Sequence, residues 1–176
     1  MVQKNTSRLQ EILALSWDSM RIAVASDHGG FPLKGRIIDE LRAAGHEVRD
    51  LGAHSAEPSD YPDFAALIAR TIQGGEAERA IFLCGSGAGA SVAANKFRGI
   101  RAATCHDSFS AHQCVEDDDV NVLCLGARII GPELALEVVR QYVNAKFSGA
   151  ERHRRRVAKI AAFEEEFGRS STQKGA

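Results

Sequence analysis

Residues 80–89 read Ala80-Ile81-Phe82-Leu83-Cys84-Gly85-Ser86-Gly87-Ala88-Gly89, an apolar run that passes directly into a glycine-rich loop. A short apolar run is typical of a parallel strand buried on both faces. Alternating glycines after it leave backbone N–H groups able to face an anion. The stretch predicts a strand that carries the Cys84 thiol to a sheet edge, beside a cradle for an oxyanion. Taken alone, it is equally compatible with a core cysteine before an ordinary strand-to-helix turn.

Outward from this stretch, strand-like and helix-like segments alternate. Strands are predicted at 22–25, 47–51, 80–84, 100–105 and 121–125. Helices are predicted at 33–41, 62–72, 88–96, 108–115, 133–147 and 152–167. The alternation predicts an α/β fold, a three-layer α/β/α Rossmann-like (flavodoxin-like) domain with a five-stranded parallel sheet and a C-terminal helix. The domain is expected to span 20–168, after an extension of unknown role at 1–19 and before a disordered tail at 169–176.

Composition excludes several classes of function. The chain has 176 residues, enough for one domain, and a net charge of −1 that gives no pull toward nucleic acid or a membrane surface. No apolar run approaches the ~20 residues of a membrane helix. The N-terminus lacks the apolar core of a signal peptide. The four cysteines form no CxxC pair, which argues against zinc and favours reduced thiols in a cytoplasmic protein.

A second polar loop, Asp27-His28-Gly29-Gly30, follows the first predicted strand. In flavodoxin-like sheets, ligands bind beyond the carboxyl ends of the strands, where the strand order reverses between strands one and three. The loop at Asp27 and the loop at Cys84 are therefore expected to meet there. The alternative for Asp27-His28 is a helix N-cap followed by an exposed histidine.

The glycine loop does not match the common phosphate-binding motifs. Ala90 stands where G-x-G-x-x-G needs its third glycine, and the Gly-Lys-Ser/Thr of a P-loop is absent. Ala90 also stands six residues after Cys84, where a cysteine phosphatase would need an arginine. What remains is a thiol, the Ser86 hydroxyl and a bed of amides. Backbone dipoles and nearby cations favour the thiolate, which can act as a general base.

Two charged clusters lie near the C-terminal helices. Arg152 and Arg156, in a basic run at 152–156, share one helical face and could clamp a phosphate, the alternative being a solvated face. Nucleic acid is disfavoured because the patch is single and lacks aromatics. The acidic run at 116–119 predicts a solvated turn between helix and strand, with a magnesium site as the less favoured alternative. Cys105, Cys114 and Cys124 are taken as residues without a chemical role.

Residues 20–160 resemble ribose-5-phosphate isomerase B and its relatives, which include galactose-6-phosphate and tetrose-phosphate isomerases. The motifs that carry the resemblance are Ala25-Ser26-Asp27-His28-Gly29-Gly30-Phe31, Asp60-Tyr61-Pro62, Cys84 to Gly89, Ala94-Asn95-Lys96, Gly99-Ile100-Arg101-Ala102, Asn121-Val122-Leu123 and Arg152 to Arg156. Together they are specific for the family and less so for its substrate.

The resemblance implies aldose–ketose isomerisation through an enediolate, without metal or organic cofactor. Cys84 would be the base, Ser86 (often threonine in the family) would assist proton traffic, and backbone amides would hold the enediolate oxygens. The implied substrate-binding residues are Asp27, Tyr61, Gly85, Gly87, Ala88, Gly89, Asn95 and Asp118, and the implied phosphate ligands are His28, Arg152 and Arg156. The family's sites form across a homodimer interface, and its dimers can pair into tetramers.

One position departs from the family pattern. Ribose-5-phosphate isomerases of this type carry a histidine that opens the furanose ring, and this chain has Asp117 there. An aspartate is a poor acid at neutral pH unless it is desolvated or crowded by like charges. Either Asp117 still opens rings, or His106 or His112 replaces it, or the substrate never closes.

The substrate expected first is ribose 5-phosphate. A tetrose 4-phosphate or hexose 6-phosphate is the alternative, because a four-carbon sugar phosphate cannot close a furanose through its phosphorylated oxygen. A non-catalytic regulatory protein that binds a sugar phosphate is the alternative from another class.

Overall fold

Five parallel strands form one sheet at the centre of the computed structural model, which describes residues 19–169. The strands are β1 (Arg21–Ser26), β2 (Glu47–Asp50), β3 (Arg79–Cys84), β4 (Ala102–Thr104) and β5 (Val122–Gly126), in the order β2-β1-β3-β5-β4. The order reverses between β1 and β3, as expected. The last two strands are exchanged relative to the flavodoxin order. The short β4 is therefore the edge strand and β5 lies directly beside β3.

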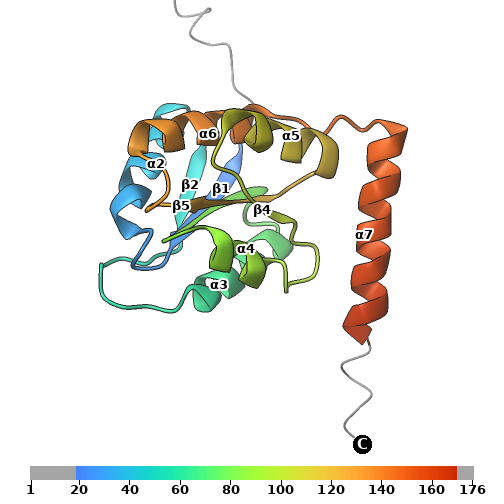
Figure 1. The fold of residues 1–176 in the computed structure, drawn as a ribbon, viewed down its shortest axis with the longest axis horizontal. Helices are drawn as coiled ribbons and strands as arrows, with labels where there is room; N and C mark the ends of the chain where they lie inside the picture. The colour runs from blue at the N-terminus through green and yellow to red at the C-terminus, as the bar shows by residue number, and fades with distance from the viewer. Residues whose placement is uncertain (1–18, 170–176) are drawn as a thin grey trace, which may run out of the picture.

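Helices cover both faces of the sheet, which confirms the predicted three-layer architecture (Figure 1). One face carries α2 (Phe31–Ala43), α5 (Ser108–Asp118) and α6 (Pro132–Asn144), and the other carries α3 (Tyr61–Gln73) and α4 (Ala88–Ala94). A last helix, α7 (Glu151–Arg169), stands apart from these layers at the side of the domain (Figure 1).

The central strand β3 shows why an apolar run forms a strand here. Ile81 and Leu83 are buried in the core under α2, α5 and α6, whereas Phe82 and Cys84 are buried in the core under α3 and α4. Successive side chains of a strand point to opposite faces, so a strand covered on both faces must be apolar throughout. The same alternation places Cys84 at the end of the strand, on the side of α3 and α4.

The acidic run is not the turn that the sequence predicts. Helix α5 continues through Asp117 and Asp118 and stops at Asp119, which has the left-handed φ of 51°. Arg101 holds this end, because its Nε donates to the Asp119 carbonyl at 2.7 Å and its guanidinium pairs with the Asp119 carboxylate at 2.6 Å. Within residues 19–169 no group of acidic, histidine or cysteine side chains is arranged to hold a metal ion.

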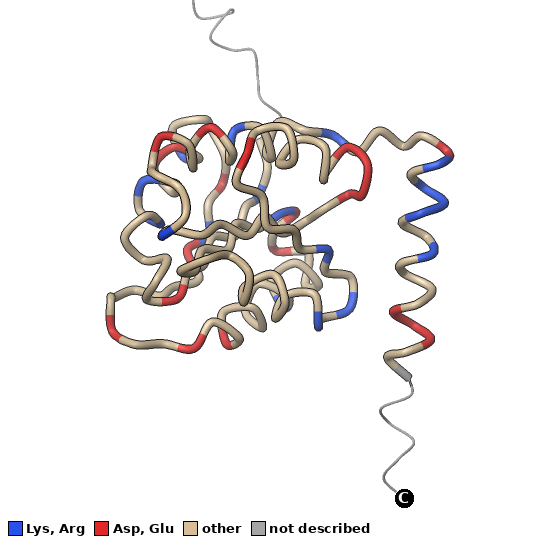
Figure 2. Tube along the Cα trace, in the orientation of Figure 1, with Lys and Arg blue, Asp and Glu red and all other residues tan. Residues whose placement is uncertain are grey.

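Helix α7 is joined to the domain near both ends. At its start, Ser148 N–H donates to the Glu116 carbonyl at 3.0 Å. Toward its end, the Glu164 carboxylate accepts from Gly99 N–H at 2.9 Å. After the acidic Glu151 at its first position, most basic residues of α7 come first and a second acidic group, residues 164–166, lies further along (Figure 2). The preceding helix α6 ends at Asn144, short of the predicted 147, and an extended Ala145 follows it.

The predicted extension at 1–19 and tail at 169–176 lie outside the described residues, apart from Ser19 and Arg169. In the described part of the chain no helix has the length and apolar character needed to cross a membrane.

Candidate active site

A cavity of about 330 Å³ opens at the carboxyl edge of the sheet, where β1, β3 and β5 end. Its lining comes from the end of β3, the loops after β1, β3 and β5, the first turn of α4 and the first residue of α3: Asp27, Tyr61, Cys84, Gly85, Ser86, Gly89, Arg128 and Ile129. The two loops expected to meet at the reversal of strand order therefore do meet. A concave site of this size with a few convergent polar groups is typical of small-ligand pockets.

The Cys84 thiol lies at the floor of this cavity. Gly87 N–H donates to Cys84 Sγ at 3.0 Å, and Gly87 adopts a left-handed φ of 81° as it begins α4. A backbone donor at this distance favours a sulfur that carries negative charge. The arrangement suits a thiol that accepts a proton.

Asp27 is buried beside the thiol loop. Its Oδ1 accepts from Gly30 N–H at 2.9 Å, which orients the carboxylate from within its own turn. Gly30 lies so close to β3 that a Cβ built on it would be 2.5 Å from the Leu83 carbonyl carbon. A glycine is therefore required where the β1–α2 loop crosses β3, and this close approach carries Asp27 to the Cys84 cavity.

Ser86 and Tyr61 also line this cavity. Ser86 Oγ accepts from Ala88 N–H at 3.3 Å, and Ser86 is exposed at the mouth. The Tyr61 ring packs over Gly89, where an added Cβ would lie 3.0 Å from the ring carbon Cζ. The first turn of a helix leaves N–H groups without intrahelical partners. The amides near Gly89 are thus available to oxygen atoms of a ligand.

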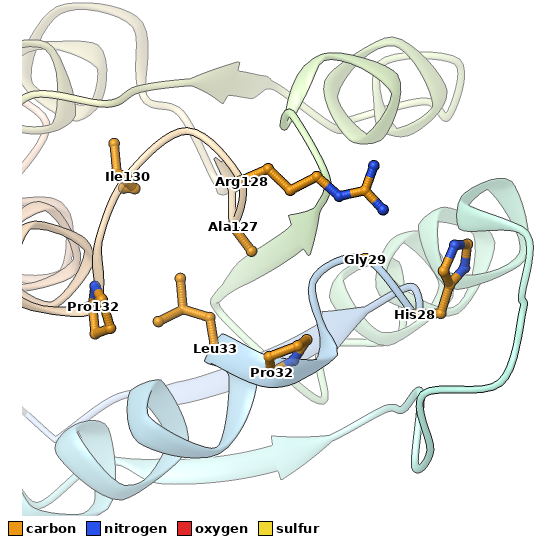
Figure 3. Close-up of a pocket in the computed structure, with 8 residues that line it drawn as sticks. All are labelled: His28, Gly29, Pro32, Leu33, Ala127, Arg128, Ile130 and Pro132. Atoms are coloured by element: carbon orange, nitrogen blue, oxygen red, sulfur yellow. The ribbon is translucent and has the colours of Figure 1, made fainter.

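Arg128 is a cavity residue that the sequence analysis missed. Its backbone N–H donates to the Gly85 carbonyl at 3.0 Å, and its guanidinium lies over Gly85. Its side chain extends on the same side as the β1–α2 loop that carries Gly29 and His28 (Figure 3). No motif spacing marks Arg128 in the sequence. It reaches the site only because β5 lies next to β3.

A second cavity of about 330 Å³ is lined by His28, Gly29 and Arg128 among others (Figure 3), and it shares Arg128 with the Cys84 cavity. His28 Nδ1 lies 3.2 Å from both the backbone nitrogen and the carbonyl oxygen of Ser59, which anchor the ring through that nitrogen. Its Nε2 makes no hydrogen bond within the described residues, and Arg128 adds a fixed positive charge nearby. The two residues place one fixed cation and one imidazole next to the Cys84 cavity.

Asn95 and Asp118 lie elsewhere. They line a cavity of about 440 Å³ whose lining includes Ile160 and Glu164 of α7. The Asn95 amide is used by the backbone of β4, because Oδ1 accepts from Ala102 N–H at 2.9 Å and Nδ2 donates to the Ala102 carbonyl at 2.8 Å. This pairing ties the end of α4 to β4.

The remaining predicted site residues gather where α5 meets α7. Arg152 and Arg156 lie on the first turns of α7, and Asp117 lies near the end of α5. None of the three lines the Cys84 cavity of its own chain. His112 pairs with Glu116 on α5 at 3.4 Å, and His106 Nε2 accepts from Gly126 N–H at 2.9 Å. One chain thus carries two separate parts of the predicted site.

Comparisons with known proteins identify the family. The profile of the Ribose/Galactose Isomerase family matches residues 22–160. The chain is 43% identical to ribose-5-phosphate isomerase B of Escherichia coli, over 82% of this chain and 97% of that protein. It is 41% identical to D-erythrulose-4-phosphate isomerase of Pectobacterium atrosepticum, over 74% and 86%.

A structure of Clostridium thermocellum ribose-5-phosphate isomerase B superimposes with a TM-score of 0.82 at 46% identity, covering 84% of this chain and 99% of that one. The fold, the cavity at Cys84 and these relatives all point to the same family. The chain belongs to the ribose/galactose isomerase family and is an isomerase of sugar phosphates.

Proposed function

We propose that the protein interconverts ribose 5-phosphate and ribulose 5-phosphate through a cis-enediolate, with Cys84 as the general base. The observation that carries the proposal is the Cys84 thiol in the cavity floor, 3.0 Å from Gly87 N–H and lining the same cavity as Asp27. The thiolate takes the proton from C2 of the aldose, and the C2–H electron pair becomes the enediolate double bond. The same thiol then returns a proton to C1.

The glycine loop stabilises the charge that develops in this step. In this proposal amides of the Gly85 to Gly89 loop donate to the enediolate oxygens, although the Gly87 and Ala88 amides also donate to Cys84 Sγ and Ser86 Oγ. Each such donor contributes on the order of a few kcal/mol in acyl-transfer enzymes. Asp27 accepts a hydrogen bond from a substrate hydroxyl. Ser86, at the mouth, relays a proton between O1 and O2. The proton transfers at Cys84 and at Ser86 need neither a metal nor an organic cofactor.

The phosphate is bound at the His28 side of the cavity. His28 and Arg128 come from one chain, and Arg152 and Arg156 come from α7 of a second copy. Two observations support this division. The α7 arginines do not line the Cys84 cavity of their own chain, and α7 exposes Ile160, Phe163 and Phe167 at 49%, 57% and 68%. An exposed apolar row beside a cavity is a surface that a second copy would cover.

A tetrose 4-phosphate is the second candidate substrate. Asp117 stands where the family resemblance has a ring-opening histidine, and an aspartate is a poor acid at neutral pH. A four-carbon sugar phosphate needs no ring opening. The relative from Pectobacterium atrosepticum is named for a substrate of this kind.

A substrate panel without added metal decides between these candidates. Purified protein is offered ribose 5-phosphate, erythrulose 4-phosphate, allose 6-phosphate and galactose 6-phosphate, and kcat/KM is measured for each. We expect the highest value with ribose 5-phosphate. Turnover of the tetrose alone would refute the pentose assignment. In that case Asp117→His, which supplies the missing acid, should raise turnover of the pentose and leave that of the tetrose unchanged.

A further inference from the structure

His153 is a buried histidine in the first turn of α7, next to the exposed Arg152. Its side chain is 3% exposed, and a buried polar group in a native structure has partners. Ser148 Oγ lies 2.7 Å from His153 Nδ1 on one side of the ring. On the other side, Arg152 Nε donates to His153 Nε2 at 2.7 Å. The ring therefore connects the chain before α7 to Arg152.

These two hydrogen bonds determine which ring nitrogen carries the proton. An arginine Nε only donates, so His153 Nε2 must offer its lone pair to Arg152. The neutral ring then carries its proton on Nδ1 and donates it to Ser148 Oγ. The bond uses the Nε edge of the guanidinium and leaves both terminal nitrogens of Arg152 for an anion.

The partners of His153 are themselves held by α5. Ser148 N–H donates to the Glu116 carbonyl at 3.0 Å. Asp117 Oδ1 lies 3.4 Å from His153 Nε2, the same atom that Arg152 approaches. The carboxylate and the Arg152 Nε are therefore at most about 6 Å apart, a distance at which opposite charges attract even near the surface. The negative charge of Asp117 therefore helps to keep the Arg152 guanidinium next to His153.

We propose that His153, supported by Asp117, is a positioning residue that holds Arg152 ready to bind the substrate phosphate. This inference rests on the proposed function, in which Arg152 contacts that phosphate. A long side chain that is already ordered loses less freedom on binding, so the ligand binds more tightly. The effect belongs to binding and not to proton transfer at Cys84. Asp117 acts here through its charge on Arg152 rather than on a sugar ring.

Two substitutions at His153 separate its two hydrogen bonds. His153→Asn keeps an amide near the place of Nδ1 and loses the contact to Arg152. His153→Gln extends an amide toward the place of Nε2, where its oxygen can accept from Arg152. We expect His153→Asn to raise KM for ribose 5-phosphate about tenfold with kcat within about twofold. His153→Gln should restore most of the lost affinity. Circular dichroism and thermal melting show whether each variant is folded.

The decisive comparison adds His153→Asn to Arg152→Ala. If His153 acts through Arg152, the double variant has the KM of Arg152→Ala alone. A further tenfold rise in the double variant would overturn the proposal, because it would show that His153 supports the site independently of Arg152. Equal KM values for His153→Asn and the wild type would overturn it as well.

Calorimetric titration with ribose 5-phosphate and with erythrulose 4-phosphate distinguishes failure of this inference from failure of the proposed function. A wild-type protein that neither isomerises nor binds any sugar phosphate of the panel would refute the proposed function, and the role of His153 with it. If the wild-type protein binds and isomerises a sugar phosphate of the panel, but substitutions at His153 and Arg152 have independent effects on KM, only the positioning role is refuted.

Discussion

Cys84 and Cys124 show how the position of a residue along a strand decides its chemistry. Both side chains belong to the core under α3 and α4, on the neighbouring strands β3 and β5. Cys124 is fully buried, and burial raises the pKa of its thiol far above the ordinary range, so it stays protonated. Cys84 ends its strand, opens to the cavity and accepts a hydrogen bond from Gly87. Of these two thiols, Cys84 is the one with a backbone N–H donor at its sulfur and a place in the lining of a cavity.

The Cys84→Ala variant should lose isomerisation and keep binding. We expect kcat to fall by at least about 100-fold, the usual contribution of a general base, with the affinity for ribose 5-phosphate within a few-fold of wild type. The matched control is Cys124→Ala, which should keep its kcat and lose roughly 1 kcal/mol of stability. Retained turnover in Cys84→Ala would show that another group is the base.

Two glycines at and within helix α2 have opposite surroundings, and only Gly30 positions the Asp27 loop. At Gly30 an added Cβ would lie 2.5 Å from β3, whereas at Gly35 it would meet no atom within 4 Å. Gly30→Ala should therefore cost roughly 2 kcal/mol and lower kcat/KM, because the loop must move away from β3. Gly35→Ala should stabilise the helix by about 0.5–1 kcal/mol and leave kcat/KM unchanged. Urea unfolding and the isomerase assay test both, and a neutral Gly30→Ala would contradict the required close approach.

A buried lysine on α2 stabilises the end of β2. Lys34 Nζ lies 2.5 Å from Asp50 Oδ1 and donates to the Ala53 carbonyl at 2.7 Å. Burial alone would raise the pKa of Asp50, but the hydrogen bonds from Lys34 and from Gly52 N–H outweigh it and leave that pKa below the usual value of 3.8. A lowered pKa means that the ion pair contributes fully above about pH 4 and is lost as the pH falls through the folded-state value.

Lys34→Met should therefore destabilise the protein by roughly 2 kcal/mol at neutral pH, because it leaves the partly buried Asp50 carboxylate without its partner. The difference between the variant and the wild type should shrink as the pH falls below about 4, where Asp50 becomes protonated. Urea unfolding of both proteins between pH 7 and pH 3 measures this difference in the free energy of unfolding. A difference that stays constant over this range would show that the charge of Asp50 is not involved.

At the scale of elements, the sequence predicts the strands and loops whose structure depends on residues close together in the chain. The apolar runs of β1, β3 and β5 reveal a sheet covered on both faces, and the glycines after β1 and β3 reveal loops that approach a ligand. The end of α5 was not predictable in this way. The acidic residues carry no Gly or Pro stop signal, and the helix ends where Arg101, from before β4, pairs with Asp119. A partner 18 residues away in the sequence leaves no local signal.

At the scale of the whole molecule, the predicted site falls into two parts. The cavity at Cys84 lies where β1, β3 and β5 end, and the α7 arginines lie where that helix stands apart from the layers (Figure 1). The sequence predicts both parts from their motifs. It did not reveal Arg128, because strand order alone brings that residue to Cys84. The structure adds that the Asn95 amide is hydrogen-bonded to the backbone of β4, and its predicted role in substrate binding stays a prediction.

The central claim is that the Cys84 cavity of one copy is completed by the α7 arginines of another. Co-expression of Cys84→Ala with Arg152→Ala, each with its own affinity tag, produces hybrid dimers that can be isolated by successive purification on both tags. Arg152→Ala alone should have a raised KM, and Cys84→Ala alone should be inactive. If each site combines Cys84 of one chain with Arg152 of the other, one site of the hybrid carries both substitutions and the other site carries none.

The measurement is the rate of ribose 5-phosphate isomerisation by the isolated hybrid at a substrate concentration well below the KM of Arg152→Ala. Our account predicts about half of the wild-type kcat/KM per dimer, with the wild-type KM, because one of two sites is intact. A hybrid that has only the average activity of its two parent variants would contradict the account, since it would show that Cys84 and Arg152 act within a single chain or not together.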